Sequence, residues 1–172
     1  ADLDLLENNK PVARMERTDG DGYGHDSFTF AGSDAIASGA AHGWLTLYGR
    51  DGARIGDLVG HTSNVWALAA TPDGSRLVSG SDDQTIRFWN TQTRESIFTL
   101  FRGRDGEWVM WTPEGYYAAS PNGDRYVGWQ INGGPDHAAR FVTAAQLKRH
   151  FYRPDILQRA VALGSAARAV AE

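Results

Sequence analysis

The chain has 172 residues, no cysteine and a formal net charge of −4 at neutral pH. So small a charge gives no reason to expect nucleic acid or an anionic membrane as partner, and the lack of cysteine excludes disulfides and thiol catalysis. No apolar run is long enough to span a bilayer and no signal peptide opens the chain, so we expect a cytoplasmic location, with a periplasmic one left open.

The first residues, 2–16, predict two short strands, because Leu3 and Leu5 alternate with polar residues. A glycine-rich stretch, TDGDGYGHD, follows at residues 18–26. Its three carboxylates, Asp19, Asp21 and Asp26, suit calcium, but the spaced acceptors and terminal Glu of a helix-loop-helix site are missing. A long connection between strands explains the stretch as well, and we predict no metal.

The most informative stretch spans residues 60–90 and reads GHTSNVWALAATPDGSRLVSGSDDQTIRFWN. The runs VWALAA, RLVSGS and TIRFW are short and rich in β-branched and aromatic residues, which predicts three strands of one antiparallel sheet. TPDG at 71–74 and SDDQ at 81–84 have the chemistry of tight turns, because Pro presets φ, Gly tolerates positive φ and Asp bonds nearby backbone.

This stretch resembles one blade of a WD-repeat β-propeller, a repeat that opens with Gly-His and closes with Trp-Asp. Here Asn90 replaces the final Asp. In that family four side chains link the strands and turns of a blade. The resemblance implies a structural network of an Asp that accepts from an imidazole and a Ser that bridges imidazole and indole. The matching residues are His61, Ser79, Asp83 and Trp89.

Weaker copies lie about 41 residues to either side, which is the propeller period. In the earlier copy, residues 30–52, Ser38 falls on the position of Ser79, but His42 falls on that of Asp83. We therefore expect this copy to lack the full polar set and to depend more on packing. In the later copy, residues 112–130, Trp129 is one place short of the Trp89 position.

The predicted fold class is all-β: a partial WD-type β-propeller of about three four-stranded blades plus half a blade, with a short α-helical C-terminal tail. After a loop at 131–136, Thr143 suits a helix N-cap and Pro154 the first turn of a second helix, with an Ala-rich linker beyond Gly164. So few blades cannot close a ring, so we expect missing blades or self-association. The predicted segments are a half blade 1–17, blades 18–59, 60–101 and 102–142, and a helical tail 143–172.

A second resemblance covers the last third of the chain. Residues 107–132 and 144–157 resemble the final blade and exit helices of certain large bacterial WD-repeat proteins, which often carry a caspase-like peptidase or other effector domain. The resemblance implies a regulatory or sensor role as the alternative function. The catalytic Cys of such a peptidase is absent, because the chain has no cysteine.

No constellation of residues predicts catalysis or a cofactor. There is no GxSxG nucleophile elbow and no phosphate-binding loop, and the five His residues lack metal-ligand spacing. A hydrolase that uses carboxylates in a central channel is a remaining, less favoured alternative. We therefore predict a non-enzymatic protein-protein interaction scaffold.

The WD resemblance also implies a partner-binding rim, formed by the loops at one end of each blade. Aromatic and Arg side chains are the usual anchors of protein interfaces. The matching residues are Asn64, Trp66 and Asp82, with Arg102, Arg104 and Trp108 in the next blade.

Overall fold

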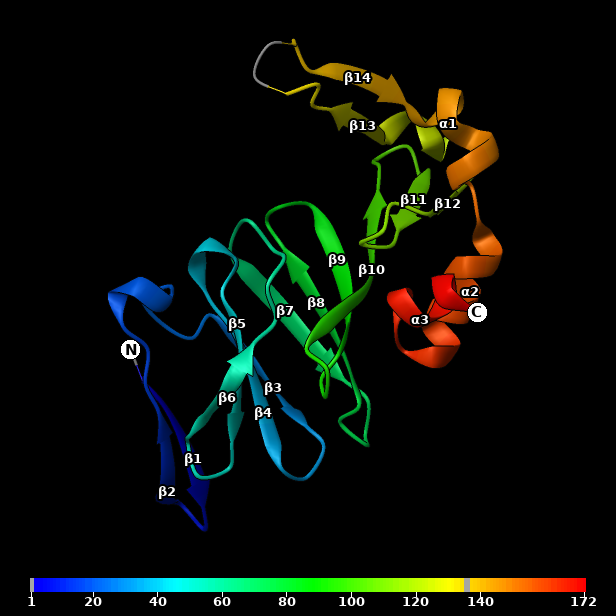
Figure 1. Ribbon diagram of the computed structural model, residues 1–172. Helices are drawn as coiled ribbons and strands as arrows, with labels where there is room; N and C mark the ends of the chain where they lie inside the picture. Colours follow the sequence, from blue (N-terminus) through cyan, green and yellow to red (C-terminus); the bar gives the residue numbers. More distant parts are fainter. Residues whose placement is uncertain (1, 135–136) are drawn as a thin grey trace. The chain divides into compact units, whose positions relative to one another are not determined.

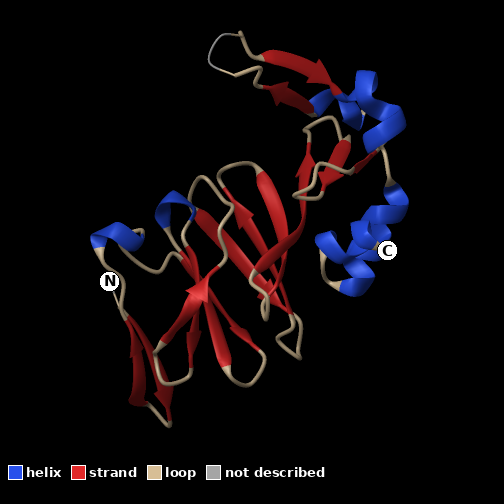
Figure 2. Cartoon of the chain, in the orientation of Figure 1, coloured by secondary structure: helices blue, strands red, loops and turns tan. Residues whose placement is uncertain are grey.

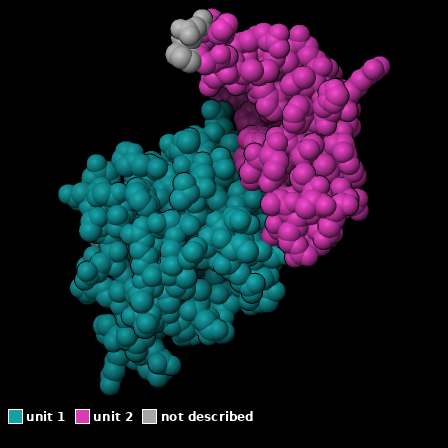
Figure 3. All heavy atoms as spheres, viewed as in Figure 1, with its two compact units in different colours: residues 1–97 teal, residues 98–172 magenta. Residues whose placement is uncertain are grey.

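The structure is a computed structural model that describes residues 2–134 and 137–172, so the last two residues of the loop predicted at 131–136 lie outside it. Strands predominate, and the α-helices of the described residues are found at the C-terminal end (Figure 2). The chain divides into two compact units, residues 1–97 and 98–172 (Figure 3). None of the described helices is long and apolar enough to cross a membrane.

The first unit holds three groups of antiparallel strands in chain order (Figure 1). The first group is a hairpin of β1 (Leu3–Glu7) and β2 (Lys10–Met15). The second is a four-stranded sheet of β3 (Ser27–Ala31), β4 (Ala35–Gly39), β5 (Leu45–Gly49) and β6 (Arg54–Asp57). The third contains β7 (Val65–Ala70), β8 (Arg76–Ser81) and β9 (Thr85–Asn90). Two single-turn 3-10 helices, η1 (Asp19–Asp21) and η2 (Ala41–Gly43), lie in its connections.

The strands β7, β8 and β9 confirm the three predicted from residues 60–90. Both turns between them contain a residue with left-handed backbone: Gly74 has φ of 70° and Gln84 has φ of 68°. Glycine adopts this left-handed conformation without strain. The turn at 71–74 joins β7 to β8 with Ala70 opposite Leu77, and the turn at 81–84 joins β8 to β9 with Leu77 opposite Trp89.

The core of the first unit lies between successive groups of strands. Side chains of the four-stranded sheet pack against β8 and β9 in one buried cluster: Ala37, Leu45, Leu47, Leu58, Leu77 and Trp89. A second cluster joins the β1–β2 hairpin to β4 and β5: Leu5, Met15, Ile36 and Tyr48. Sheets of consecutive strands that stack face to face are the arrangement of neighbouring propeller blades. A partial propeller, as the sequence predicts, accounts for this packing.

The second unit combines short strands with helices (Figure 1). β10 (Glu95–Arg102) begins in the first unit and ends in the second, where it pairs with β11 (Trp108–Trp111), and β11 pairs with β12 (Tyr117–Ala119). β13 (Gly128–Ile131) and β14 (Arg140–Thr143) form a hairpin. The helices are η3 (Gly123–Tyr126), α1 (Ala144–Phe151), α2 (Pro154–Leu163) and α3 (Ala166–Ala171).

Residues 102–142 differ from the single four-stranded blade expected there. The boundary predicted between segments 60–101 and 102–142 falls at the end of β10, although β10 pairs with β11. β13 and β14 form a separate two-stranded sheet. The cause is the connection after β12, which forms η3 instead of a tight turn. Hydrogen bonds to Asp105 from Arg125 and Tyr126 hold η3 beside the β10–β11 turn. β13 therefore starts away from the edge of β12.

The tail confirms the helix starts but corrects the linker. Thr143 precedes α1 and its N–H donates to Gln146 Oε1 at 3.0 Å, as in a capping box. Pro154 begins α2. The chain beyond Gly164 is a third helix, because Gly164 takes φ of 62° and ends α2, and the Ser165 hydroxyl then caps α3 by accepting from Arg168 N.

Candidate functional site

The four residues matched to the WD network form one hydrogen-bonded chain across β8, β9 and the loop before β7. Trp89 Nε1 donates to Ser79 Oγ at 2.8 Å, and Ser79 Oγ lies 2.7 Å from His61 Nε2. His61 Nδ1 lies 2.7 Å from Asp83 Oδ2. Because an ionised carboxylate only accepts, His61 donates from Nδ1 to Asp83, and in a neutral imidazole Nε2 is then the acceptor. Ser79 therefore accepts from the Trp89 indole and donates its own O–H to His61 Nε2. We call this chain the Trp89–Asp83 relay.

The relay favours a neutral imidazole opposite an ionised carboxylate. Burial lowers the pKa of His61, although the hydrogen bond to Asp83 partly opposes this. Burial alone would raise the pKa of Asp83, but hydrogen bonds from Thr85 and His61 outweigh it and hold that pKa below its usual value. A neutral His61 can accept from Ser79, whereas a protonated one could not.

Ser79, His61 and Asp83 have the spacing of a hydrolytic triad, but their surroundings are unsuited to catalysis. A nucleophile must be reached by its substrate. Ser79 has no exposed surface, and the hydrogen bond from Trp89 Nε1 holds its hydroxyl between two buried rings. The arrangement is that of a structural link between strands.

Asp83 extends the relay into the loops at one end of the blade. Its Oδ2 also accepts from Thr62 N at 3.2 Å, and its Oδ1 accepts from Thr85 N at 2.9 Å. Asp82 N donates to Asn64 O at 3.0 Å. One carboxylate therefore ties the loop before β7 to the turn between β8 and β9.

Three of the predicted rim residues lie on this tied pair of loops, in different environments. Trp66 is the extra residue at a β-bulge, between the pairs Val65–Ser81 and Ala67–Gly80, and is 52% exposed. Asp82 is exposed beside it on the turn. Asn64 is half-buried, and its Oδ1 accepts from His42 N at 3.3 Å, so it links the loops of two sheets.

The other three predicted rim residues lie in the second unit, around the β10–β11 turn. Arg102 and Arg104 are exposed there. Trp108 is half-buried at the start of β11, and its N–H donates to Ser120 Oγ at 2.8 Å. The Glu107 carboxylate accepts hydrogen bonds from the hydroxyl of the same Ser120 and from Asn122 Nδ2, so side chains also order this turn.

The sequence reasoning missed a second polar network, in the sheet of β3–β6. His25 Nδ1 lies 2.6 Å from Ser38 Oγ, and His25 Nε2 lies 3.1 Å from Met15 O. Arg17 is buried and donates to Ser38 O at 2.7 Å. This sheet therefore has a polar network in addition to its apolar packing. The sequence feature that could have indicated this network is the pair Gly24-His25. It lies 36 residues before Gly60-His61, whereas the repeat period is about 41 residues.

Comparison with known proteins identifies the repeat. Residues 52–90 match the family model "WD domain, G-beta repeat". This segment therefore carries a WD40 repeat, and the first resemblance seen in the sequence is confirmed to that extent.

Curated relatives match part of the chain. The sequence is 43% identical over 54 residues to "Ribosome biogenesis protein bop1" of Danio rerio, covering 31% of this chain and 7% of that protein. It is 31% identical over 80 residues to "Eukaryotic translation initiation factor 3 subunit I" of Scheffersomyces stipitis, covering 46% and 21%. It is 43% identical over 68 residues to an uncharacterized WD repeat-containing protein of Synechocystis sp., covering 38% and 20%. The chain thus spans about a fifth or less of the length of these relatives.

Among solved structures, the chain is similar to the WD40 β-propeller domain of Doa1, with a TM-score of 0.49 and 14% identity. That alignment covers 69% of this chain and 43% of the Doa1 chain. It is also similar to the computationally designed Ika4 protein, with a TM-score of 0.47 and 18% identity, over 78% of this chain and 98% of the other.

Proposed function

We propose that this chain is a non-catalytic protein-protein interaction scaffold, and that a protein partner binds the loops around Trp66 and Asp82. The observation that carries the proposal is the β-bulge at Trp66. A bulge re-aims a side chain out of the regular alternation of a strand, and here it leaves a large indole half exposed. The relay fixes the loops beneath it, so little conformational entropy is lost on binding.

The chemistry of the blade supports a scaffold in place of an enzyme. The described Ser, His and Asp side chains closest to a catalytic arrangement are committed to the relay. The curated relatives have names that refer to ribosome biogenesis and to a translation initiation factor subunit. A scaffold binds its partner through rigid loops and needs no catalytic residues.

The test is a capture experiment with matched variants. We expect Trp66→Ala to reduce the yield of the specific partner at least fivefold, because loss of a central aromatic anchor costs about 2 kcal/mol. Tyr23→Ala removes another exposed aromatic side chain, in the loop before β3, and should leave the yield unchanged. Equal yields from wild type and Trp66→Ala, with both proteins folded by circular dichroism, would argue against this surface.

A second candidate is a regulatory or sensor segment of a bacterial protein with a caspase-like peptidase or other effector domain. It is favoured by the likeness of residues 107–132 and 144–157 to such proteins, and by the folded helices α1–α3 that continue from β14. Sequencing the coding DNA beyond both ends tests it. A downstream effector domain with its own His and Cys would support this role, and a stop codon after Glu172 would exclude it.

A further inference from the structure

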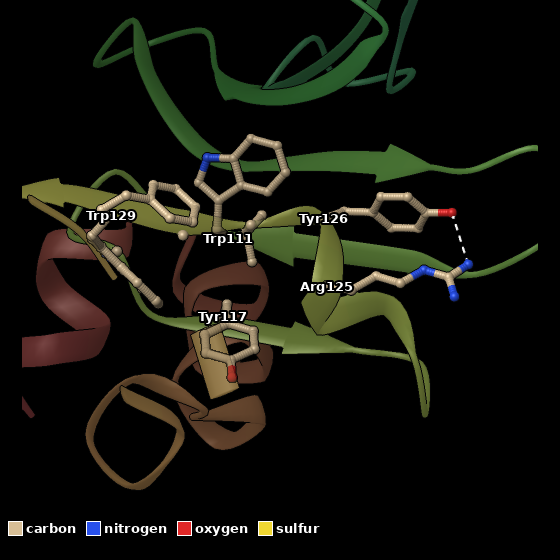
Figure 4. Close-up of a pocket in the computed structure, with 9 residues that line it drawn as sticks. Trp111, Tyr117, Arg125, Tyr126 and Trp129 are labelled. Carbon is tan, nitrogen blue, oxygen red and sulfur yellow. Dashed lines mark hydrogen bonds between the residues drawn. The ribbon is translucent and has the colours of Figure 1, made fainter. Parts of the chain in front are cut away.

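The second unit contains an aromatic pocket that is separate from the Trp66 loops. It has a volume of about 430 Å³ and is lined by side chains from β11, β12, η3, β13 and β14 (Figure 4). Its principal lining residues are Trp111, Tyr117, Arg125, Tyr126, Trp129 and Phe141. Five of these residues are aromatic and one is an arginine, so the pocket is walled mainly by rings.

The inner wall of the pocket is rigid. The Trp129 ring lies 4.9 Å from the ring of Phe151 on α1 and 5.9 Å from that of Tyr117, measured between centroids. The Tyr117 hydroxyl donates to Ala144 O at 3.3 Å. Contacts between offset or edge-on rings hold aromatic side chains in one orientation. The wall is therefore formed before any ligand arrives.

The outer edge is held by Asp105. Its carboxylate pairs with Arg125 and accepts from the Tyr126 hydroxyl at 2.7 Å. Arg125 also donates to the Tyr126 hydroxyl at 3.2 Å, as the dashed line in Figure 4 marks. The Tyr126 hydroxyl thus both donates and accepts. Phe141 completes the edge from β14 and is 66% exposed.

The polar groups that remain for a ligand are donors. Neither the Trp111 nor the Trp129 indole N–H hydrogen-bonds to any residue that the structure describes. The unused N–H groups of Arg125 are donors as well. A ligand that complements this lining has apolar rings or faces and carbonyl acceptors, and it needs no donor of its own.

We propose that this pocket binds a proline-rich segment in the polyproline II conformation. Such a segment presents pyrrolidine rings and solvated carbonyls and lacks backbone N–H groups. Aromatic grooves recognise these segments at low entropic cost, because the ligand is already extended. The site is independent of the partner surface proposed around Trp66.

The test uses decaproline as the probe, with tryptophan fluorescence and calorimetry as readouts on the full chain. We expect saturable binding that Phe141→Ala weakens at least fivefold, because one stacking wall is lost. Trp111→Phe keeps a ring but removes the indole donor and should weaken binding about five- to tenfold, the effect of one hydrogen bond. Tyr23→Ala, outside the pocket, should bind as wild type does.

Two results would overturn the proposal. One is the absence of decaproline binding to the folded wild type at millimolar peptide, and the other is equal affinity of wild type and Phe141→Ala. Tetramethylammonium serves as the competing chemistry. If it binds the pocket more tightly than decaproline does, the site is an aromatic cage for cations and the assignment to proline-rich segments is wrong.

Discussion

Two neighbouring aspartates on one turn have opposite surroundings. Asp83 accepts hydrogen bonds from His61, Thr62 and Thr85, whereas Asp82 is exposed. Replacing Asp83 with Ala would leave the imidazole and two backbone donors without their acceptor. We expect Asp83→Ala to lower the free energy of unfolding by about 1–3 kcal/mol in urea melts.

Asp82→Ala is the matched control for this substitution, because it removes the same group one residue earlier. A surface change of this kind shifts stability by no more than about 0.5 kcal/mol. If Asp83→Ala cost no more than Asp82→Ala, the relay would not contribute to stability.

The pKa of His61 gives a second prediction at the residue scale. Burial lowers this pKa in the folded chain, so the unfolded chain binds more protons as the pH falls below about 6.5. Stability from this group is therefore present above pH 6.5 and lost as the pH falls. Burial and the charge of Arg17 lower the pKa of His25 too, with the same sign.

We expect the free energy of unfolding to decrease between pH 7 and pH 5, by at most about 1.4 kcal/mol per pH unit for each of these histidines. His61→Gln should reduce this slope, because the contribution of His61 is then lost. Urea melts at several pH values measure it. A stability that stays level or rises as the pH falls over this range would contradict the buried, neutral imidazole.

Single residues show what the sequence could and could not predict about the site. His61, Ser79, Asp83 and Trp89 stand at motif positions, so their link could be expected before the structure. The His25–Ser38 contact could not, because a shortened connection shifts Gly24-His25 out of the period and Arg17 joins from the connection after the β1–β2 hairpin.

At the scale of elements, close backbone approach between neighbouring sheets depends on a glycine. Gly43 in η2 has φ of 82°, and a Cβ there would lie 2.0 Å from His61 O. Gly43→Ala thus combines a strained conformation with a clash against backbone. We expect it to cost more than about 2 kcal/mol by urea melts.

Gly80→Ala is the control for Gly43→Ala. A Cβ on Gly80, in β8, would only contact Ala67 at an ordinary 3.6 Å. Its effect should be within about 1 kcal/mol and is expected to be stabilising if anything. Similar losses at both positions would show that η2 does not fix the approach of the two sheets.

Whole strands were predictable where apolar alternation and turn chemistry agreed, as in β7–β9. The single four-stranded blade expected over residues 102–142 differs from the structure after β12, where the connection forms η3 and β13 and β14 make a separate sheet. The reason is tertiary: Asp105 from another turn binds Arg125 and Tyr126, and no local pattern records that. Likewise an Ala-rich stretch was taken for a linker, although Ala is the strongest helix former and Ser165 supplies the cap for α3.

At the scale of the whole molecule, apolar surface of the first unit remains uncovered. Phe28 and Phe30 on β3 are 59% and 55% exposed, and they line a pocket with residues of β1. Among the described strands β3 pairs only with β4, so one of its edges is free. Repeat arrays with an unmatched apolar face tend to associate.

We therefore predict concentration-dependent self-association of this chain in sedimentation velocity runs. The double variant Phe28→Lys, Phe30→Lys should sediment as a monomer, because it places charge on the uncovered face. A wild type that remains monomeric over the whole micromolar range would show that this face does not associate with copies of the chain.

The central claim is that one relay, from Trp89 through Ser79 and His61 to Asp83, ties the WD-type blade to the loops that carry Trp66. Long-range nitrogen-proton NMR of the imidazole of His61 tests it most directly. The expected result at pH 7 is a single neutral tautomer, protonated at Nδ1 and unprotonated at Nε2, with slow exchange of the Nδ1 proton. A protonated imidazole, an averaged pair of tautomers or a proton fixed on Nε2 would contradict the relay.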